Sequence, residues 1–252
     1  MSKREERLQK LVELVSGSVS LHVKDAAKHL NVSEMTIRRD INDSHCSPLN
    51  LLGGYIVKSK DQDPISHYFV SQQQQRHVIE KKHIGRLAAS LVQNNDIVFF
   101  DCGTTTPYII ENIPEHIHFT GVCYSLNVFV TLQKHENCNV ILCGGQFEVD
   151  NAIFTPIIEQ SPLDIICPSK SFISAAGISF KGITCFNLHE VNWKKKAINK
   201  SNTTILVADS SKFDELKAAY FGVLSDFDML ISDHINDEYL AFCHQNNIKA
   251  YQ

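Results

Sequence analysis

From residue 77 onward the sequence alternates short apolar runs with amphipathic segments, and this alternation limits the folds open to the chain. The run Ile97–Phe100 is apolar at every position, as strands buried on both faces are. Residues 81–92 before it place apolar side chains on one face of a helix. Strand-like runs follow at residues 119–124, 140–143, 171–175, 204–208, 229–232 and 248–251, and most are separated by helical segments such as residues 126–132 and 191–200. This repeat predicts a Rossmann-like α/β domain, in which helices cover a parallel sheet.

Polar residues gather where the first of these strands ends. Residues 101–107 read Asp-Cys-Gly-Thr-Thr-Thr-Pro, so that Gly103 permits a tight turn and three threonines supply hydroxyls. The backbone N–H groups of such a turn, with the start of a helix predicted at residues 107–112, can bind a phosphate without a lysine. Open parallel sheets bind ligands at this edge. A threonine-rich helix cap without a ligand is the alternative interpretation.

Later strand ends carry groups of the same kind. Ser125 and Asn127 follow the second predicted strand, and Asp209, Ser211 and Lys212 follow a later one. Lys212 can pair with a phosphate, and Asp209 or Asn127 can accept hydrogen bonds from sugar hydroxyls. These segments are predicted to meet the first one at a single ligand site.

Glu190 and Lys194 lie four residues apart where the helical segment predicted at residues 191–200 begins. On spacing alone, a Glu followed by a Lys at this separation is most simply an ion pair on a helix surface. A contact with a ligand is the second interpretation of the pair.

The stretch of residues 32–41 reads as a short capped helix with a basic outer face. Ser33 can accept a hydrogen bond from a free N–H of the first turn, and Ile37 and Ile41 share the inner side. Arginine can donate two hydrogen bonds to guanine, and threonine and methionine carbons can contact a thymine methyl. The residues predicted to contact DNA are Ser33, Met35, Thr36, Arg38 and Arg39.

The segments around this helix predict a winged helix-turn-helix. Residues 4–15 and 24–30 have the spacing of two further helices, and only Asn31 and Val32 separate the second from the Ser33 cap. Residues 49–52 and 55–57 fit two short strands around Gly53 and Gly54, which would form the wing. A surface helix that is merely basic is the alternative.

Charge supports a division of the chain into a head and a body. Residues 1–60 hold ten Lys and Arg against seven Asp and Glu, while the whole chain has a net charge of −4. A basic end on an acidic body suits a protein that contacts DNA phosphates with one end only. We therefore expect a winged helix-turn-helix domain at residues 1–57, a linker at 58–76 and a sensor domain at 77–252.

Composition favours a soluble cytoplasmic protein. No apolar run approaches the ~20 residues of a membrane span, and the first ten residues lack the apolar centre of a signal peptide. The eight cysteines form no Cys-x-x-Cys motif, and several lie within apolar runs, so buried reduced thiols are expected rather than disulfides or zinc. No metal and no cofactor is predicted.

Motifs spread over nearly the whole chain resemble those of the DeoR family of bacterial repressors. They are VSEMTIRRD in the head and FFDCGTTT, YSLN, LCGG, AAGI, KGIT and VADSSKF in order along the body. The stretches LLGGYIV, DNAIF and TCFNL resemble in particular those family members that control deoxyribonucleoside breakdown. Two departures are Ala175-Ala176-Gly177, where many members have Gly-Ala-Asp-Gly, and a wing without the family's Arg and His.

The resemblance implies a transcriptional repressor that binds double-stranded operator DNA as a homo-oligomer, a dimer or higher. The body would be similar to ribose-5-phosphate isomerase and would bind a phosphorylated sugar, here deoxyribose 5-phosphate, whose arrival weakens operator binding. No membrane partner and no catalytic residue is implied. The ligand-binding residues that match family motifs are Asp101, Gly103, Thr104, Thr105, Thr106, Ser125, Asn127, Glu190, Lys194, Asp209, Ser211 and Lys212.

Two alternatives remain open from the sequence. The body would be a working sugar-phosphate isomerase if a carboxylate moved the proton beside the carbonyl, and Asp101, Glu190 and Asp209 are the possible bases. The chain would otherwise be an activator of the same architecture, which sequence does not distinguish from a repressor.

Overall fold

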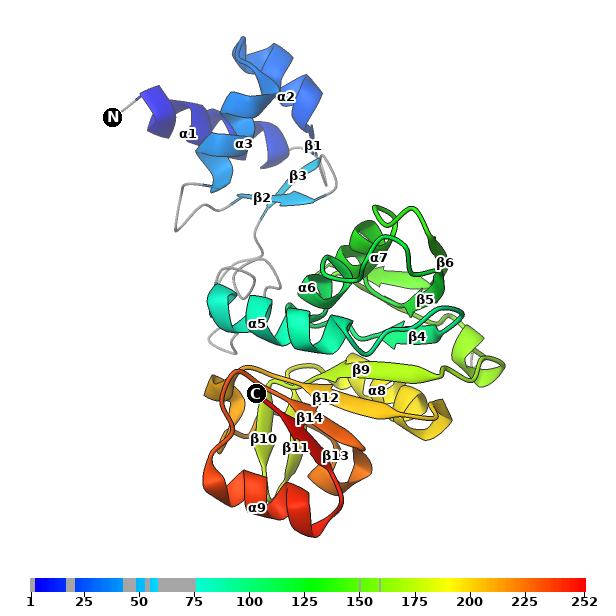
Figure 1. Ribbon diagram of the computed structural model, residues 1–252. Coiled ribbons are helices and arrows are strands. Elements are labelled where there is room, and N and C mark those ends of the chain that lie inside the picture. The colour runs from blue at the N-terminus through cyan, green and yellow to red at the C-terminus, as the bar shows by residue number, and fades with distance from the viewer. Residues whose placement is uncertain are drawn as a thin grey trace. The chain divides into compact units, whose positions relative to one another are not determined.

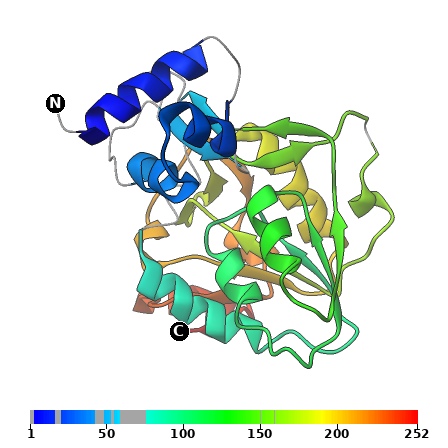
Figure 2. The same cartoon turned by 90° about the horizontal axis from the view of Figure 1, so that it is seen from above.

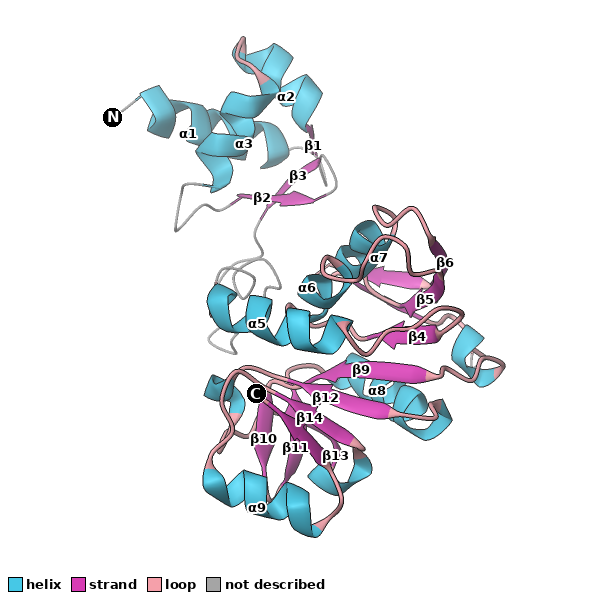
Figure 3. Ribbon diagram, in the orientation of Figure 1, coloured by secondary structure: helices cyan, strands magenta, loops and turns pink. Residues whose placement is uncertain are grey.

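The computed structural model describes residues 3–16, 21–42, 49–52, 55–58, 76–149, 151–158 and 160–252. The chain divides into two compact units, residues 1–67 and 68–252. Figure 1 labels their elements, and Figure 3 distinguishes helices from strands. No helix within the described ranges combines the length and the apolar character needed to cross a membrane.

The first unit packs three helices against a small antiparallel sheet of order β1-β3-β2. Apolar side chains from all three helices and from β2 and β3 form one core, which includes Leu11, Ile37 and Ile56. This is the predicted winged helix-turn-helix, although the turn glycines of the wing lie outside the described residues. Its elements are α1 (Lys3–Ser16), β1 (Leu21–His22), α2 (Val23–Leu30), α3 (Glu34–Asn42), β2 (Leu49–Leu52) and β3 (Tyr55–Lys58).

Local sequence fixes the turn between α2 and α3. Asn31 ends α2 in the left-handed conformation with φ of 51°, which asparagine tolerates better than most residues, and its N–H donates to helix carbonyls. Ser33 then accepts from the N–H of Thr36 at 3.1 Å, which confirms the predicted cap. The two helices therefore follow each other with only a three-residue turn.

The second unit is built on a seven-stranded parallel sheet of order β15-β14-β12-β9-β4-β5-β6. All seven strands were predicted from the sequence, within two residues at each end. They are β4 (Ile97–Phe100), β5 (Phe119–Cys123), β6 (Cys138–Leu142), β9 (Lys170–Ser174), β12 (Thr204–Val207), β14 (Met229–Ile231) and β15 (Lys249–Tyr251).

Helices cover both faces of this sheet (Figure 2). Val98 and Phe100 of β4 face a core formed with α5 (Val78–Ala89), α6 (Thr106–Ile110) and α7 (Leu126–Leu132). Phe99 between them faces a second core, formed with α8 (Leu188–Lys200) and α9 (Asp237–Gln245). The continuous apolar strand is thus explained by burial on both sides.

The sequence analysis missed several short elements. β10 (Gly177–Ser179), β11 (Gly182–Cys185) and β13 (Ala219–Gly222) form an antiparallel sheet of order β10-β11-β13, and β7 (Gln146–Glu148) pairs with β8 (Ile153–Thr155). Strands of three or four residues carry too few alternations to be recognised, and β13 pairs with a strand distant in sequence. Of the cysteines in the described ranges, seven are free thiols and five of these are buried.

Candidate functional site

A pocket opens at the carboxyl end of the parallel strands in the second unit. It lies where β4, β9 and β12 end, and side chains from α5, β11 and α8 complete its wall. This is the edge at which the sequence predicted a ligand site. The lining residues are Lys81, Cys102, Gly103, Thr104, Thr105, Ser174, Ala175, Ala176, Cys185, Phe186, Glu190, Lys194, Ala208, Asp209 and Lys212.

The turn after β4 forms one side of the pocket. Gly103 approaches β9 so closely that a Cβ atom would lie 2.3 Å from Oγ of Ser174, so only glycine fits. Thr106 donates its hydroxyl to the carbonyls of Asp101 and Gly103 at 2.8 Å each, which closes the turn. Thr104 and Thr105 line the pocket and are buried. The helix that follows, α6, has only five residues, so its dipole contributes less than the longer predicted helix would.

Two lysines also line the pocket. Lys81 of α5 is 3% exposed, and burial lowers the pKa of its ammonium group to about 8, with Asp209 acting in the opposite direction. Lys212 lies 3.7 Å from the carboxylate of Asp209, which also accepts from the N–H of Ser211. Lys81 was not predicted from the sequence, although a lysine on the same helix face as Ile84 and Ala88 is unusual enough to have indicated a site.

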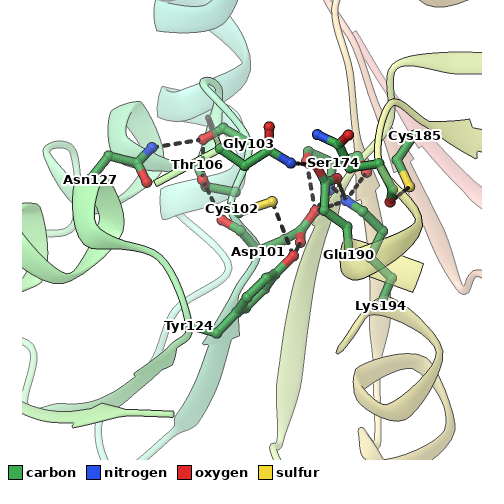
Figure 4. Close-up of polar contacts among 12 residues, drawn as sticks. Asp101, Cys102, Gly103, Thr106, Tyr124, Asn127, Ser174, Cys185, Glu190 and Lys194 are labelled. Atoms are coloured by element: carbon green, nitrogen blue, oxygen red, sulfur yellow. Dashed lines mark hydrogen bonds and ion pairs between the residues drawn. The ribbon is translucent and has the colours of Figure 1, made fainter. Parts of the chain in front are cut away.

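A buried ion pair lies at the inner end of the pocket (Figure 4). Lys194 of α8 donates to the carboxylate of Asp101, which also accepts from the hydroxyl of Tyr124 at 2.6 Å and from the N–H and hydroxyl of Ser174 at 2.8 and 2.6 Å. Burial alone would raise the pKa of Asp101, but the ammonium group and these donors lower it below its usual value. Burial would lower the pKa of Lys194, and the charge of Asp101 raises it well above its usual value instead. Both groups are therefore charged.

Glu190 lies beside this pair, with its carboxylate 3.6 Å from the ammonium group of Lys194. Interpretation of the two residues as an ion pair on the helix surface was wrong, because they are only 4% and 1% exposed. Burial raises the pKa of Glu190, since Lys194 is already paired with Asp101. Glu190 accepts a hydrogen bond from the side chain of Asn151 at 2.9 Å. An i,i+4 spacing does not reveal which face of a helix is covered.

The structure brings seven of the twelve sequence-predicted ligand residues to the pocket lining. These seven are Gly103, Thr104, Thr105, Glu190, Lys194, Asp209 and Lys212. The other five are placed around it: Asp101 and Thr106 bond within the protein, Ser211 donates to Asp209, Asn127 donates to the carbonyl of Gly103 at 3.5 Å, and Ser125 is fully buried. The residues that the sequence analysis missed are Lys81, Cys102, Ser174, Ala175, Ala176, Cys185, Phe186 and Ala208.

The chemistry of this pocket suits an anion with hydroxyl groups. Hydroxyls of threonine and the two lysines can hold a phosphate, while Asp209 and Glu190 can contact hydroxyls. Burial raises the pKa of the Cys102 thiol well above its usual value, which makes it a poor nucleophile. No group of three His, Cys, Asp or Glu residues in the described ranges is placed to hold a metal ion.

In the first unit, α3 presents the predicted outer face to solvent. Met35 is 74% exposed, and Arg38 and Arg39 are exposed, whereas Ile37 and Ile41 are buried in the core. Thr36 is half-buried, with its hydroxyl 2.9 Å from that of Ser33.

The other side of α3 is held to α1 by a charged contact. Arg7 donates to the buried carboxylate of Asp40 at 2.6 Å, and Arg4 donates to the Asp40 carbonyl at 3.1 Å. An exposed basic face on a helix anchored in this way has the arrangement of a recognition helix.

Comparison with known proteins shows similarity over both units. Residues 7–60 match the DeoR-like helix-turn-helix domain, and residues 76–234 match the DeoR C terminal sensor domain. The deoxyribose operon repressor of Escherichia coli is 48% identical over 250 residues, which cover 98% of each chain. The transcriptional regulator YulB of Bacillus subtilis is 31% identical over 230 residues, which cover 90% of this chain and 88% of that protein.

Similarity to solved structures is weaker. A D-ribose-5-phosphate isomerase in complex with phospho-erythronic acid matches with a TM-score of 0.40 and 16% identity, over 53% of this chain and 52% of that chain. The eIF2B delta subunit from Chaetomium thermophilum matches with a TM-score of 0.45 and 14% identity, over 64% of this chain and 58% of that chain.

Proposed function

This chain belongs to the DeoR family of bacterial transcriptional repressors, and on that premise we propose that it represses genes of deoxyribonucleoside and deoxyribose breakdown. The proposed effector is a phosphorylated sugar, deoxyribose 5-phosphate, which binds in the pocket and releases the protein from its operator. The operon named in the 48% identical relative supports this choice of genes.

The observation that carries the choice of effector class is the combination of two kinds of group in the lining of one pocket. Thr104 and Thr105, together with Lys81 and Lys212, provide donors and positive charge suited to a phosphate. Glu190 and Lys194, which line the same pocket, provide buried polar groups suited to the sugar. A phosphorylated sugar suits both kinds of group, whereas a free sugar has no phosphate for the threonine hydroxyls and the lysines to bind.

The supporting residues around the pocket have a proposed positioning role. Asp101 fixes the ammonium group of Lys194, and Thr106 fixes the conformation of the phosphate turn. Ser211 holds the carboxylate of Asp209. Replacement of any of these would alter the geometry of the neighbouring lining residue.

At the DNA end, the proposed contacts are made by Ser33, Met35, Thr36, Arg38 and Arg39. We propose that the chain acts in the cytoplasm as a homo-oligomer, because two recognition helices in successive major grooves match a palindromic operator. The sugar phosphate would then favour an arrangement of the sensor domains in which the two recognition helices are no longer spaced to match the operator. This requires that the sugar phosphate bind that arrangement more tightly than the operator-binding one, since a ligand shifts an equilibrium only through its differential affinity. The proposed boundaries remain 1–57 for the head, 58–76 for the linker and 77–252 for the sensor.

The chain is not proposed to be an isomerase. Its relatives are named as transcriptional regulators, and the candidate bases are poorly suited to accept a proton. Asp101 is paired with Lys194, and Glu190 accepts a hydrogen bond from Asn151 beside the same ammonium group. Asp209 is occupied as the cap of a helical turn.

The test is a titration of the operator-bound, full-length protein with deoxyribose 5-phosphate and, separately, with ribose 5-phosphate. Release by deoxyribose 5-phosphate at lower concentration than by ribose 5-phosphate is the expected result. No release by either compound would contradict the proposed effector, and conversion of either compound by the purified protein would contradict the non-enzymatic role.

A further inference from the structure

Part of the pocket lining consists of small side chains that carry no hydroxyl, amide or charge. Ala175 and Ala176 come directly after β9, and Cys185 is the last residue of β11. We refer to these three residues as the apolar wall. They line the same pocket as Thr104 and Thr105, which are proposed to hold the phosphate. A sugar phosphate bound there therefore meets the apolar wall as well as the polar groups.

Strand pairing holds two residues of the apolar wall together. β10 and β11 are antiparallel, with Gly177 opposite Thr184. Ala176 and Cys185 are the next residues beyond this pair, and Ala176 donates its N–H to the carbonyl of Thr184 at 2.9 Å. Side chains at opposite positions of neighbouring antiparallel strands lie next to each other. Since Ala176 is 8% and Cys185 2% exposed, the two form one buried apolar surface of the lining.

The apolar wall begins beside the phosphate turn. Gly103 of that turn approaches Ser174 so closely that a Cβ atom would lie 2.3 Å from Oγ of Ser174, and Ala175 is the next residue of the chain. Figure 4 shows Gly103, Ser174 and Cys185 around the same buried ion pair. A pentose whose 5-phosphate is bound at the turn would therefore have its carbon chain next to the apolar wall.

Polar atoms of the apolar wall already have partners within the protein. The N–H of Ala176 is bonded to Thr184, and the thiol of Cys185 donates to the carbonyl of Asn187 at 3.5 Å. Burial raises the pKa of this thiol to about 12, so it is neutral at pH 7. A ligand hydroxyl placed against the wall would lose its hydrogen bonds to water and would find only a thiol sulfur, which is a weak acceptor. A CH₂ group in the same place would lose no hydrogen bond.

Deoxyribose 5-phosphate and ribose 5-phosphate differ only at carbon 2, which carries two hydrogens in the first and a hydroxyl in the second. We propose that the apolar wall packs against carbon 2 of the effector, so that Ala176 and Cys185 determine specificity for a 2-deoxy sugar. The inference rests on the proposed function, because it assumes that the pocket takes a pentose phosphate. An apolar surface of this kind discriminates against one added hydroxyl by about 10- to 100-fold.

The experiment adds a hydroxyl to the apolar wall and measures the ratio of two affinities. In calorimetric titrations of the full-length wild type, the dissociation constant for ribose 5-phosphate should be about 10 to 100 times that for deoxyribose 5-phosphate. Ala176→Ser and Cys185→Ser each introduce a hydroxyl that can accept a hydrogen bond from the 2-hydroxyl of ribose. In both variants this ratio should fall about tenfold, as expected for one hydrogen bond.

The controls separate specificity from damage to the pocket. Ala241→Ser is the matched substitution, because Ala241 is an exposed alanine of α9 outside the pocket lining, and it should leave the ratio unchanged. Inorganic phosphate, titrated as a third probe, should bind all the variants with the affinity of the wild type. Thermal unfolding verifies that each protein is folded.

The possible outcomes separate this inference from the proposed function. A lower ratio in either variant, with unchanged affinity for inorganic phosphate, supports the inference. An unchanged ratio in both folded variants, or a lower ratio accompanied by loss of phosphate binding, overturns it while leaving the effector in place. Equal affinities of the wild type for the two sugar phosphates overturn it too, but leave a pentose phosphate as effector. A wild type that binds neither sugar phosphate contradicts the proposed function and the inference together.

Discussion

Lys81 should make the affinity for the effector depend on pH in a window where few other groups titrate. Burial lowers the pKa of Lys81 from its usual 10.5 to about 8. A bound phosphate favours the ammonium form, so affinity follows the protonated fraction of Lys81. That fraction falls from about nine-tenths at pH 7 to about one-tenth at pH 9, and the affinity should fall by about tenfold. The phosphate of the effector, with a second pKa of about 6, stays a dianion throughout.

The lowered pKa of Lys81 also predicts how the free energy of unfolding depends on pH. A lysine whose pKa is lower in the folded than in the unfolded state destabilises the fold when both states hold the proton, here below pH 8. The difference between the usual pKa of 10.5 and a pKa of about 8 corresponds to about 3 kcal/mol. Between about pH 8 and 10.5 the folded protein loses this proton first, so this group raises the free energy of unfolding as pH increases.

The assay is calorimetric titration with deoxyribose 5-phosphate at several values between pH 7 and 9, for the wild type and for Lys81→Met. The variant should bind about 10- to 100-fold more weakly at pH 7, as expected for a lost charged hydrogen bond, and should show little pH dependence in this window. It should also resist urea better than the wild type at pH 7. Lys82→Met is the control, because Lys82 is the exposed neighbour on α5. A wild-type affinity that is flat from pH 7 to 9, or the same decline in Lys81→Met, would refute the assignment.

Three further predictions concern the turn, the ion pair and the recognition helix. Thr105→Val removes one buried hydroxyl of the phosphate turn. In a gel-shift titration the variant should still bind the operator, but the sugar phosphate should no longer release it. Unchanged release would mean that the phosphate binds elsewhere. Lys194→Met leaves the carboxylate of Asp101 buried without its cation, so the free energy of unfolding, measured by urea denaturation, should fall by about 3–5 kcal/mol. The control is Lys195→Met at the exposed neighbour, which should change the free energy of unfolding by less than about 0.5 kcal/mol. Arg38→Ala and Arg39→Ala should each lose about 1–3 kcal/mol of operator discrimination if that side chain contacts a base, and unchanged operator affinity in both would contradict the role of α3.

The recognition helix and the parallel sheet could be predicted because their causes are local. The cap at Ser33, the left-handed Asn31 and the inward Ile37 act within a few residues of one another. An apolar run such as Ile97–Phe100 is likewise recognised without knowledge of its neighbours, because burial on both faces requires it to be apolar throughout.

Which polar residues meet at the pocket was only partly predictable. The turn at Gly103 to Thr105 was predicted because a glycine followed by hydroxyl residues at the end of a strand is typical of a turn that can bind a phosphate. Lys81 was hidden inside an ordinary amphipathic pattern, and Ser174 lies on a strand whose partners come from distant parts of the chain.

By itself, then, the sequence determined the two domain types, the seven parallel strands and the chemistry of the turn after the first strand. The tertiary structure decided that Glu190 and Lys194 are buried, since α8 packs in the same core as β11 and β13, with Lys194 5.1 Å from the centre of the Phe221 ring. Burial is a property of what covers a residue, and the covering strands are too short and too distant in sequence to be read from periodicity. For this reason a pair that spacing places on a surface becomes, in the folded protein, the charged inner end of the pocket.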